Sequence, residues 1–169
     1  QETMAQDDLV AKTAQSLLEQ LTGVALIWIG QTGACDRLSD LLGMPAPKGE
    51  TGDKAEGRRT TAAKVSALVI ANALIFQEQL AATHSQVTPL RRLEDQRDVV
   101  GAARAHWQWI WQNINYVPIF QLGERVLAEL PITAHTLASF QALLKEAQAI
   151  CAHQAALRHD LMGRIYHWL

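Results

Sequence analysis

The segment TTAAKVSALVIANALIFQEQLAA, residues 60–82, contains the longest apolar stretch of the chain, Val65 to Phe76. A helix over this segment would be apolar on nearly every side, and Thr60 or Thr61 can cap its start. A helix that is apolar all round is buried at the centre of a bundle. The segment therefore predicts a central helix, in which Asn72 must bond to a neighbouring helix or to a loop backbone.

The composition predicts a single soluble domain. The chain has 169 residues, of which 49% are hydrophobic, and this is enough to bury a core. Its net charge of -2 does not indicate a dedicated nucleic-acid or membrane-surface protein, so such a contact would need a local patch. The apolar stretch Val65 to Phe76 is shorter than the ~20 residues that span a bilayer, and the polar, acidic first residues predict no signal peptide. Cys35 and Cys151 lack a CxxC pattern and indicate a reduced chain, so we expect a cytoplasmic protein without membrane contact.

A helical hairpin is predicted before the central helix. Asp7 and Asp8 suit the start of a helix. The helix then carries apolar residues at steps of three and four, namely Val10, Ala14, Leu17, Leu21, Val24 and Trp28. A short buried strand over Val24 to Ile29, bounded by Gly23 and Gly30, is the alternative, but the stripe stays in phase through Gly23 and favours the helix. Asp36 to Leu42 predicts a short second helix that Gly43 ends.

Residues 43–59 predict a flexible linker or loop. They contain two prolines, three glycines and mixed charge, so nothing in them is expected to pack. The chain is thereby divided into a helical hairpin over residues 1–42, this linker, and a main helical body over residues 60–169.

Two further amphipathic patterns extend the main body. The first carries Val100, Ala103, Trp107, Ile110, Trp111 and Ile114, with Trp109 turned toward the surface. Pro118 fits the first turn of the next helix, and Thr133 can cap a long helix with Phe140 and Leu144 on its apolar side. No segment alternates as a strand does. The fold class is therefore an all-α helical bundle of about six or seven helices without a significant sheet.

No catalytic, cofactor-binding or metal site is predicted within this chain. The cysteines and histidines lack metal-ligand spacing, because Cys151 and His153 diverge on a helix. Basic residues gather loosely before and after the central helix, with acids between them, which is typical of a solvated face. Contact with nucleic-acid phosphates is the alternative. The candidate residues for it are Arg58, Arg59, Lys64, Arg91, Arg92 and Arg97.

The end of the chain, DLMGRIYHWL over residues 160–169, combines an acid, a Gly-Arg pair and an apolar Tyr-His-Trp-Leu run. This ending predicts that the natural polypeptide continues into a further domain, and the start at Gln1 fits an excised fragment. We expect Tyr166, Trp168 and Leu169 to be exposed, and either sticky or disordered, where that domain would cover them.

Three segments carry a family resemblance, namely residues 70–78 (IANALIFQE), 107–120 (WQWIWQNINYVPIF) and 160–168 (DLMGRIYHW). Together they resemble the helical region of N6-adenine DNA methyltransferases, of the multidomain restriction-modification type and similar to type I modification subunits. The resemblance covers about residues 60–169. It implies that the last segment leads into an S-adenosylmethionine-binding catalytic domain. The residues at this junction would be Asp160, Gly163, Arg164, Tyr166 and Trp168.

The chain departs from that family at the catalytic motifs. It has no Asn-Pro-Pro-aromatic motif, which would hold the flipped adenine, and no glycine-rich cofactor loop. The resemblance therefore implies a non-catalytic module that engages DNA and docks its own catalytic domain, with S-adenosylmethionine bound elsewhere in the full-length protein. The alternative is a free-standing helical protein-protein interaction domain. A homodimer through the apolar C-terminal end is a further expectation.

Overall fold

The computed structural model describes residues 2–152 and 163–169, and the described chain is helical without a strand. The prediction of an all-α bundle is therefore confirmed. A further helical turn and a half covers residues 163–168. The main helices are α1 (Glu2–Trp28), α2 (Thr32–Leu41), α3 (Gly52–Ala81), α4 (Leu90–Glu94), α5 (Val99–Asn113), α6 (Val117–Leu127) and α7 (Ala134–Cys151).

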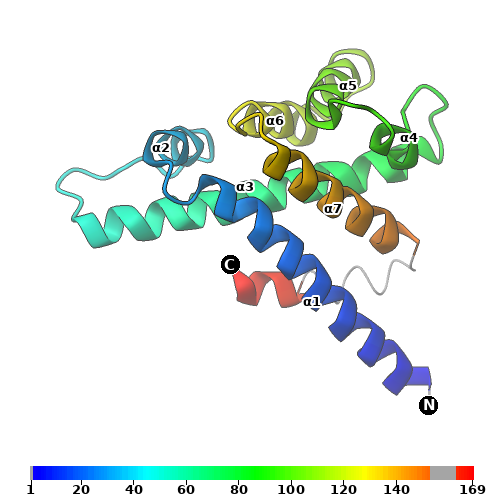
Figure 1. Ribbon diagram of the computed structural model, residues 1–169, viewed down its shortest axis with the longest axis horizontal. Helices are drawn as coiled ribbons and strands as arrows, with labels where there is room; N and C mark the ends of the chain where they lie inside the picture. The colour runs from blue at the N-terminus through cyan, green and yellow to red at the C-terminus, as the bar shows by residue number, and fades with distance from the viewer. Residues whose placement is uncertain (1, 153–162) are drawn as a thin grey trace.

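Helix α3 is the axis of the bundle. Its 30 residues make it about 45 Å long. Helices α1, α2, α6 and α7 all pack against it, with α2 near its start and α6 nearer its end (Figure 1). By length and composition α3 could cross a membrane, but half of its apolar window is buried inside the bundle, as expected of a core helix.

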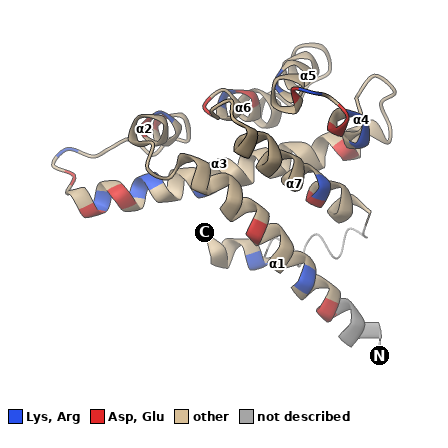
Figure 2. Ribbon diagram, in the orientation of Figure 1, with Lys and Arg blue, Asp and Glu red and all other residues tan. Residues whose placement is uncertain are grey.

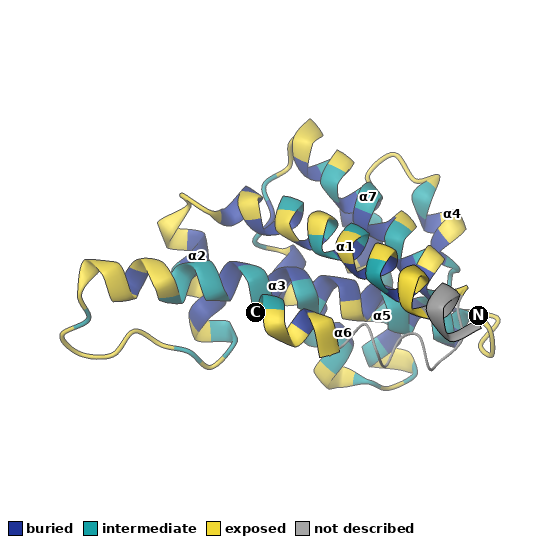
Figure 3. Ribbon diagram, turned by 90° about the horizontal axis from the view of Figure 1, so that it is seen from below, coloured by how far each residue is buried: buried dark blue, intermediate teal, exposed yellow. Residues whose placement is uncertain are grey.

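The apolar stripe of α1 faces α3 and α7, as the spacing predicts. All six of its residues, from Val10 to Trp28, are buried. Figure 3 shows this division between a buried inner side and an exposed outer side along α1 and α3. The alternative of a strand over Val24 to Ile29 is wrong, because α1 continues without a break to Trp28.

The linker predicted over residues 43–59 is too long. Helix α3 starts at Gly52, so residues 52–59 form its first two turns. Thr51 has an extended backbone, Asp53 lies in the first turn, and the charged residues that follow are good helix formers. The glycines and mixed charge had indicated a loop. Ion pairs from Arg58 and Arg59 instead hold the start of α3 in place, as described below.

Helices α5 and α6 form a hairpin against the second half of α3. Trp107 and Phe120 are fully buried between them. The turn passes through Tyr116, whose φ of 67° is left-handed, and its ring packs edge-on against Phe76 with centroids 4.9 Å apart. Pro118 lies in the first turn of α6, as predicted.

Thr133 caps α7 as predicted, since its hydroxyl oxygen accepts the backbone N–H of Thr136 at 3.0 Å. The prediction for Asn72 is wrong, because this residue is exposed on α3. The polar residue that ties α3 to its neighbours is Gln77, which is fully buried. Its position continues the buried row through Ile70 and Leu74, so the helical spacing contained the signal.

Candidate functional site

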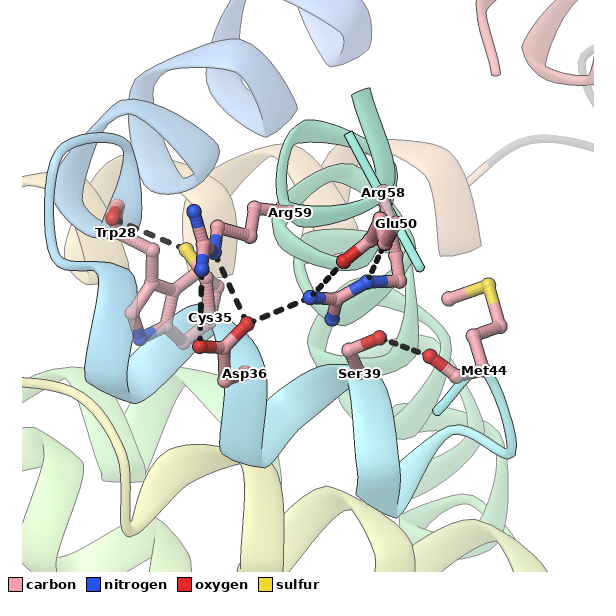
Figure 4. A network of polar contacts seen from close by, with 8 residues as sticks. All are labelled: Trp28, Cys35, Asp36, Ser39, Met44, Glu50, Arg58 and Arg59. Atoms are coloured by element: carbon pink, nitrogen blue, oxygen red, sulfur yellow. Dashed lines mark hydrogen bonds and ion pairs between the residues drawn. The ribbon is translucent and has the colours of Figure 1, made fainter. Parts of the chain in front are cut away.

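The six basic residues predicted to contact phosphates fall into two groups that the fold keeps apart. The first group, Arg58, Arg59 and Lys64, lies on α3. Arg58 Nε is 2.8 Å from Glu50 Oε1, and its Nη2 is 2.9 Å from Asp36 Oδ1. Arg59 holds both oxygens of the same carboxylate, at 2.9 and 3.2 Å (Figure 4). Both guanidinium groups are therefore engaged within the protein.

The electrostatics of this network centre on Asp36. Hydrogen bonds from Arg59 and then Arg58 lower the pKa of Asp36 from 3.8 to about 2. Hydrogen bonds to Glu50 and then to Asp36 raise the pKa of Arg58, and the hydrogen bond to Asp36 raises the pKa of Arg59. Since Asp36 is on α2 and Glu50 is in the loop before α3, the network fastens α2 and this loop to the start of α3.

Next to the network, Cys35 is buried and its thiol donates to the backbone oxygen of Trp28 at 3.2 Å. Burial raises the pKa of the Cys35 thiol, with a smaller contribution from Asp36, so the reactive thiolate is disfavoured. Ser39 hydrogen-bonds the backbone oxygen of Met44 and closes the turn after α2. These contacts explain local structure and bring no catalytic group together.

Replacing Asp36 by asparagine should lower the thermal midpoint of unfolding at neutral pH and leave little difference from wild type near pH 2. The folded-state pKa is depressed, so the contribution of Asp36 is fully present above about pH 4 and is lost as the pH falls through about 2. Thermal unfolding followed by circular dichroism across this pH range measures the difference.

Asp40→Asn is the matched control for that variant. Asp40 is exposed on the same helix, and no ion pair within residues 2–152 and 163–169 includes it. A gap between Asp36→Asn and wild type that is as large at pH 2 as at pH 7 would contradict the assignment to this carboxylate.

Lys64, the third residue of the first group, is also engaged. Its ammonium nitrogen lies 5.1 Å from the ring centroid of Trp168, which is the distance of a cation–π contact. Trp168 belongs to the C-terminal segment, so this contact joins a candidate phosphate ligand to a candidate junction residue. The sequence predicted both residues but not their contact, because 104 residues separate them.

The second group is free of such contacts. Arg91 and Arg92 on α4, and Arg97 before α5, are exposed, and in the described part of the chain no acid pairs with them. Glu94 lies between them and Asp98 directly follows Arg97, and both acids are engaged elsewhere. Glu94 contacts Lys145 at 3.5 Å and Gln148 at 3.1 Å, and Asp98 caps α5 through the N–H of Gly101. Figure 2 shows these basic residues on α4 and on the segment leading to α5.

The candidate junction is partly described. Asp160 lies outside the described residues. In the segment 163–168, Ile165 is buried and Trp168 is half-buried against the core, whereas Gly163, Arg164 and Tyr166 are exposed. Tyr166 is the most exposed large hydrophobic residue of this segment, at 73%. The expectation of exposed Tyr166 and Leu169 is confirmed, while Trp168 is partly covered.

Exposed apolar side chains gather around this segment and α1. Seven large hydrophobic residues are exposed in the described chain, and five of them lie on or directly after these two elements: Leu9, Leu26, Ile29, Tyr166 and Leu169. A groove of about 940 Å³ separates the two elements, with Leu18 and Leu26 on its α1 wall and Arg164 and His167 opposite. Exposed apolar surface of this kind marks interaction sites.

Sequence reasoning missed a buried polar cluster between the second half of α3 and α5. Gln77 accepts the indole N–H of Trp107 at 2.8 Å and donates to the backbone oxygen of Thr88 at 2.7 Å. The backbone N–H of Thr88 in turn donates to His106 Nε2 at 3.0 Å. Burial lowers the pKa of His106, which favours the neutral ring that this bond requires. The role of this cluster is structural, because its three hydrogen bonds join α3, α5 and the residues before α4.

The described side chains do not form a metal centre, since no three His, Cys, Asp or Glu residues among them could hold an ion together. Trp109, expected toward the surface, is half-buried and stacks on His106 with the rings 3° from parallel. Searches against protein-family models, curated proteins and solved structures find no match to the chain.

Proposed function

We propose that this chain is the non-catalytic helical module of an S-adenosylmethionine-dependent adenine-N6 DNA methyltransferase of a restriction-modification system. In this proposal the module is cytoplasmic, engages DNA and docks its own catalytic domain, which binds the S-adenosylmethionine. The family is suggested by the resemblance at residues 160–168. The observation that carries the docking role is the placement of the C-terminal segment, because Ile165 and Trp168 anchor it while Tyr166 faces outward.

The anchoring has a physical consequence for a following domain. Ile165 is buried in the core cluster, and Lys64 covers the ring of Trp168, so the segment is held on two sides. A domain that begins directly after Leu169 would therefore start from a fixed position. Tyr166 and Leu169 would then supply apolar contact area to it, with the tyrosine as the larger group.

DNA engagement is assigned to Arg91, Arg92 and Arg97. These guanidinium groups are exposed and unpaired among the described residues, whereas Arg58, Arg59 and Lys64 are held by Asp36, Glu50 and Trp168. A phosphate can bind a free guanidinium without first breaking an ion pair. The contacts would position the module on the DNA backbone and would not read sequence.

Titration of the protein against duplex DNA at 50 and 200 mM salt tests the DNA role. Three phosphate contacts predict that affinity falls about 40-fold between these concentrations. The variant R91A/R92A/R97A should bind more weakly at 50 mM and lose most of this salt dependence. The control K48A/K54A removes two exposed lysines elsewhere and should retain it. Binding that is equal in both variants would contradict the assignment.

The genomic reading frame tests the family. A frame that continues past Leu169 into a glycine-rich loop and an Asn-Pro-Pro-aromatic motif is the expected result, and a stop codon there would sink the proposal. The second candidate, a free-standing helical interaction domain, would then stand. It is favoured by the gathering of exposed apolar residues on α1 and the C-terminal segment.

A further inference from the structure

One side of α1 carries a stripe of three apolar and two polar residues along the groove that it shares with the segment 163–168. We define this outer stripe by its five members at helical spacing: Ala11, Gln15, Leu18, Thr22 and Leu26. It runs for about four turns, or roughly 22 Å, along the groove shared with residues 164 and 167. Leu26 is 56% exposed, and no side chain lies close to Gly23. The groove is therefore long and open enough to take a helix.

Two opposite charges lie along one edge of this stripe. Lys12 and Glu19 are seven residues apart, so they lie on the same side of α1, and both are exposed. Within the described chain, Glu19 has no ion-pair partner, and Lys12 contacts only the exposed Asp8, at 3.3 Å. A surface with one positive and one negative group at a fixed spacing is complementary to an antiparallel copy of itself.

We infer that α1 of a second copy of this chain packs antiparallel on the outer stripe. The twofold axis passes beside Gln15 and Ser16, midway between Lys12 and Glu19. Each Lys12 then faces Glu19 of the second copy, and the two ion pairs lie on the same edge of the contact. In a parallel pairing the charged edges of the two copies would lie on opposite sides of the contact, so Lys12 would not meet Glu19 and neither ion pair would form.

The shape of the stripe agrees with this register. On the other edge, Leu18 falls near the small residue Ala11 of the second copy, which leaves room for it. The contact uses the same patch on both chains, as twofold interfaces do. It places the homodimer on α1 and not on the C-terminal apolar end that the sequence predicts.

The dimer contact is separate from the docking surface proposed above. On the segment 163–168, Arg164 and His167 line the groove. At 100° per residue, Tyr166 and Leu169 project to the far side of that segment, beyond Ile165 and Trp168. A catalytic domain could therefore bind Tyr166 while α1 binds a second copy. The inference does not rest on the proposed function.

Sedimentation velocity over a concentration series tests the dimer. The wild-type protein should dimerise, and K12E or E19K should each raise the dimer dissociation constant by about tenfold, since each creates two like-charge contacts. The double variant K12E/E19K restores both pairs with reversed signs and should recover wild-type dimerisation. The controls K48E and E56K make the same charge changes at exposed positions off α1 and should have no effect.

Disulfide crosslinking tests the register. In the antiparallel contact the two copies of residue 15 meet, so Q15C should form a covalent dimer in oxidised glutathione, whereas two copies of residue 26 lie about 30 Å apart and L26C should not. Wild type, with Cys35 and Cys151, provides the background. A monomer at all concentrations, a charge swap that fails to restore the dimer, or crosslinking through position 26 would each overturn the inference.

Discussion

Replacing Gln77 by leucine is expected to lower the free energy of unfolding by about 2–4 kcal/mol, because the buried indole of Trp107 and the half-buried backbone oxygen of Thr88 lose their hydrogen-bond partner. Gln77 is fully buried and joins three elements. Its amide oxygen accepts the indole N–H of Trp107 on α5, and its amide nitrogen donates to the backbone of Thr88 before α4. Leucine has a similar volume, so the packing loss is small and the unpaired polar atoms dominate. Chemical denaturation measures the change.

Asn72→Leu is the matched control on the same helix. Asn72 is exposed, so the same kind of change there should alter stability by less than about 0.5 kcal/mol. If Gln77→Leu were as mild as Asn72→Leu, the cluster of Gln77, Trp107 and Thr88 would not hold α3, α4 and α5 together.

Replacing Gly123 by valine is expected to destabilise the protein by about 1–3 kcal/mol through overpacking. Gly123 is buried on α6, where it faces Trp107 on α5 and Ala73 on α3. A Cβ there would lie 3.0 Å from two ring carbons of Trp107 and 3.3 Å from Cβ of Ala73. Trp107 cannot move away freely, because its N–H is held by Gln77. Alanine should already cost stability, and the larger branched valine should cost more.

Gly57→Ala on α3 is the opposite control. Gly57 lies inside a helix with no atom within 4 Å of the added Cβ, so alanine should stabilise the protein by up to about 1 kcal/mol. The two glycines thus predict opposite signs for the same substitution to alanine. A stabilising effect at Gly123 would show that α6 can shift away from Trp107 without loss.

The candidate site was only partly readable from the sequence. The sequence marked six basic residues as equivalent. It shows which residues are charged, but it does not show which of these charges are already paired within the fold. Ion pairs between α2 and α3, and the contact of Lys64 with Trp168, remove three of them from that set. These contacts join residues 22 to 104 positions apart, and no local pattern encodes such a distance.

What the sequence determined by itself is the helical architecture. Apolar residues at steps of three and four fixed the buried sides of α1, α5 and α7, because a helix repeats every 3.6 residues. The mostly apolar run from Val65 to Phe76 indicated α3 as the central helix. Only the tertiary structure decided which polar groups are buried and where the charged start of α3 begins. Gln77 and not Asn72 became the buried amide, and α3 started at Gly52 and not at Thr60. In each case partners distant in the chain decided the outcome, since a buried or charged polar group is stabilised by the atoms it meets in space.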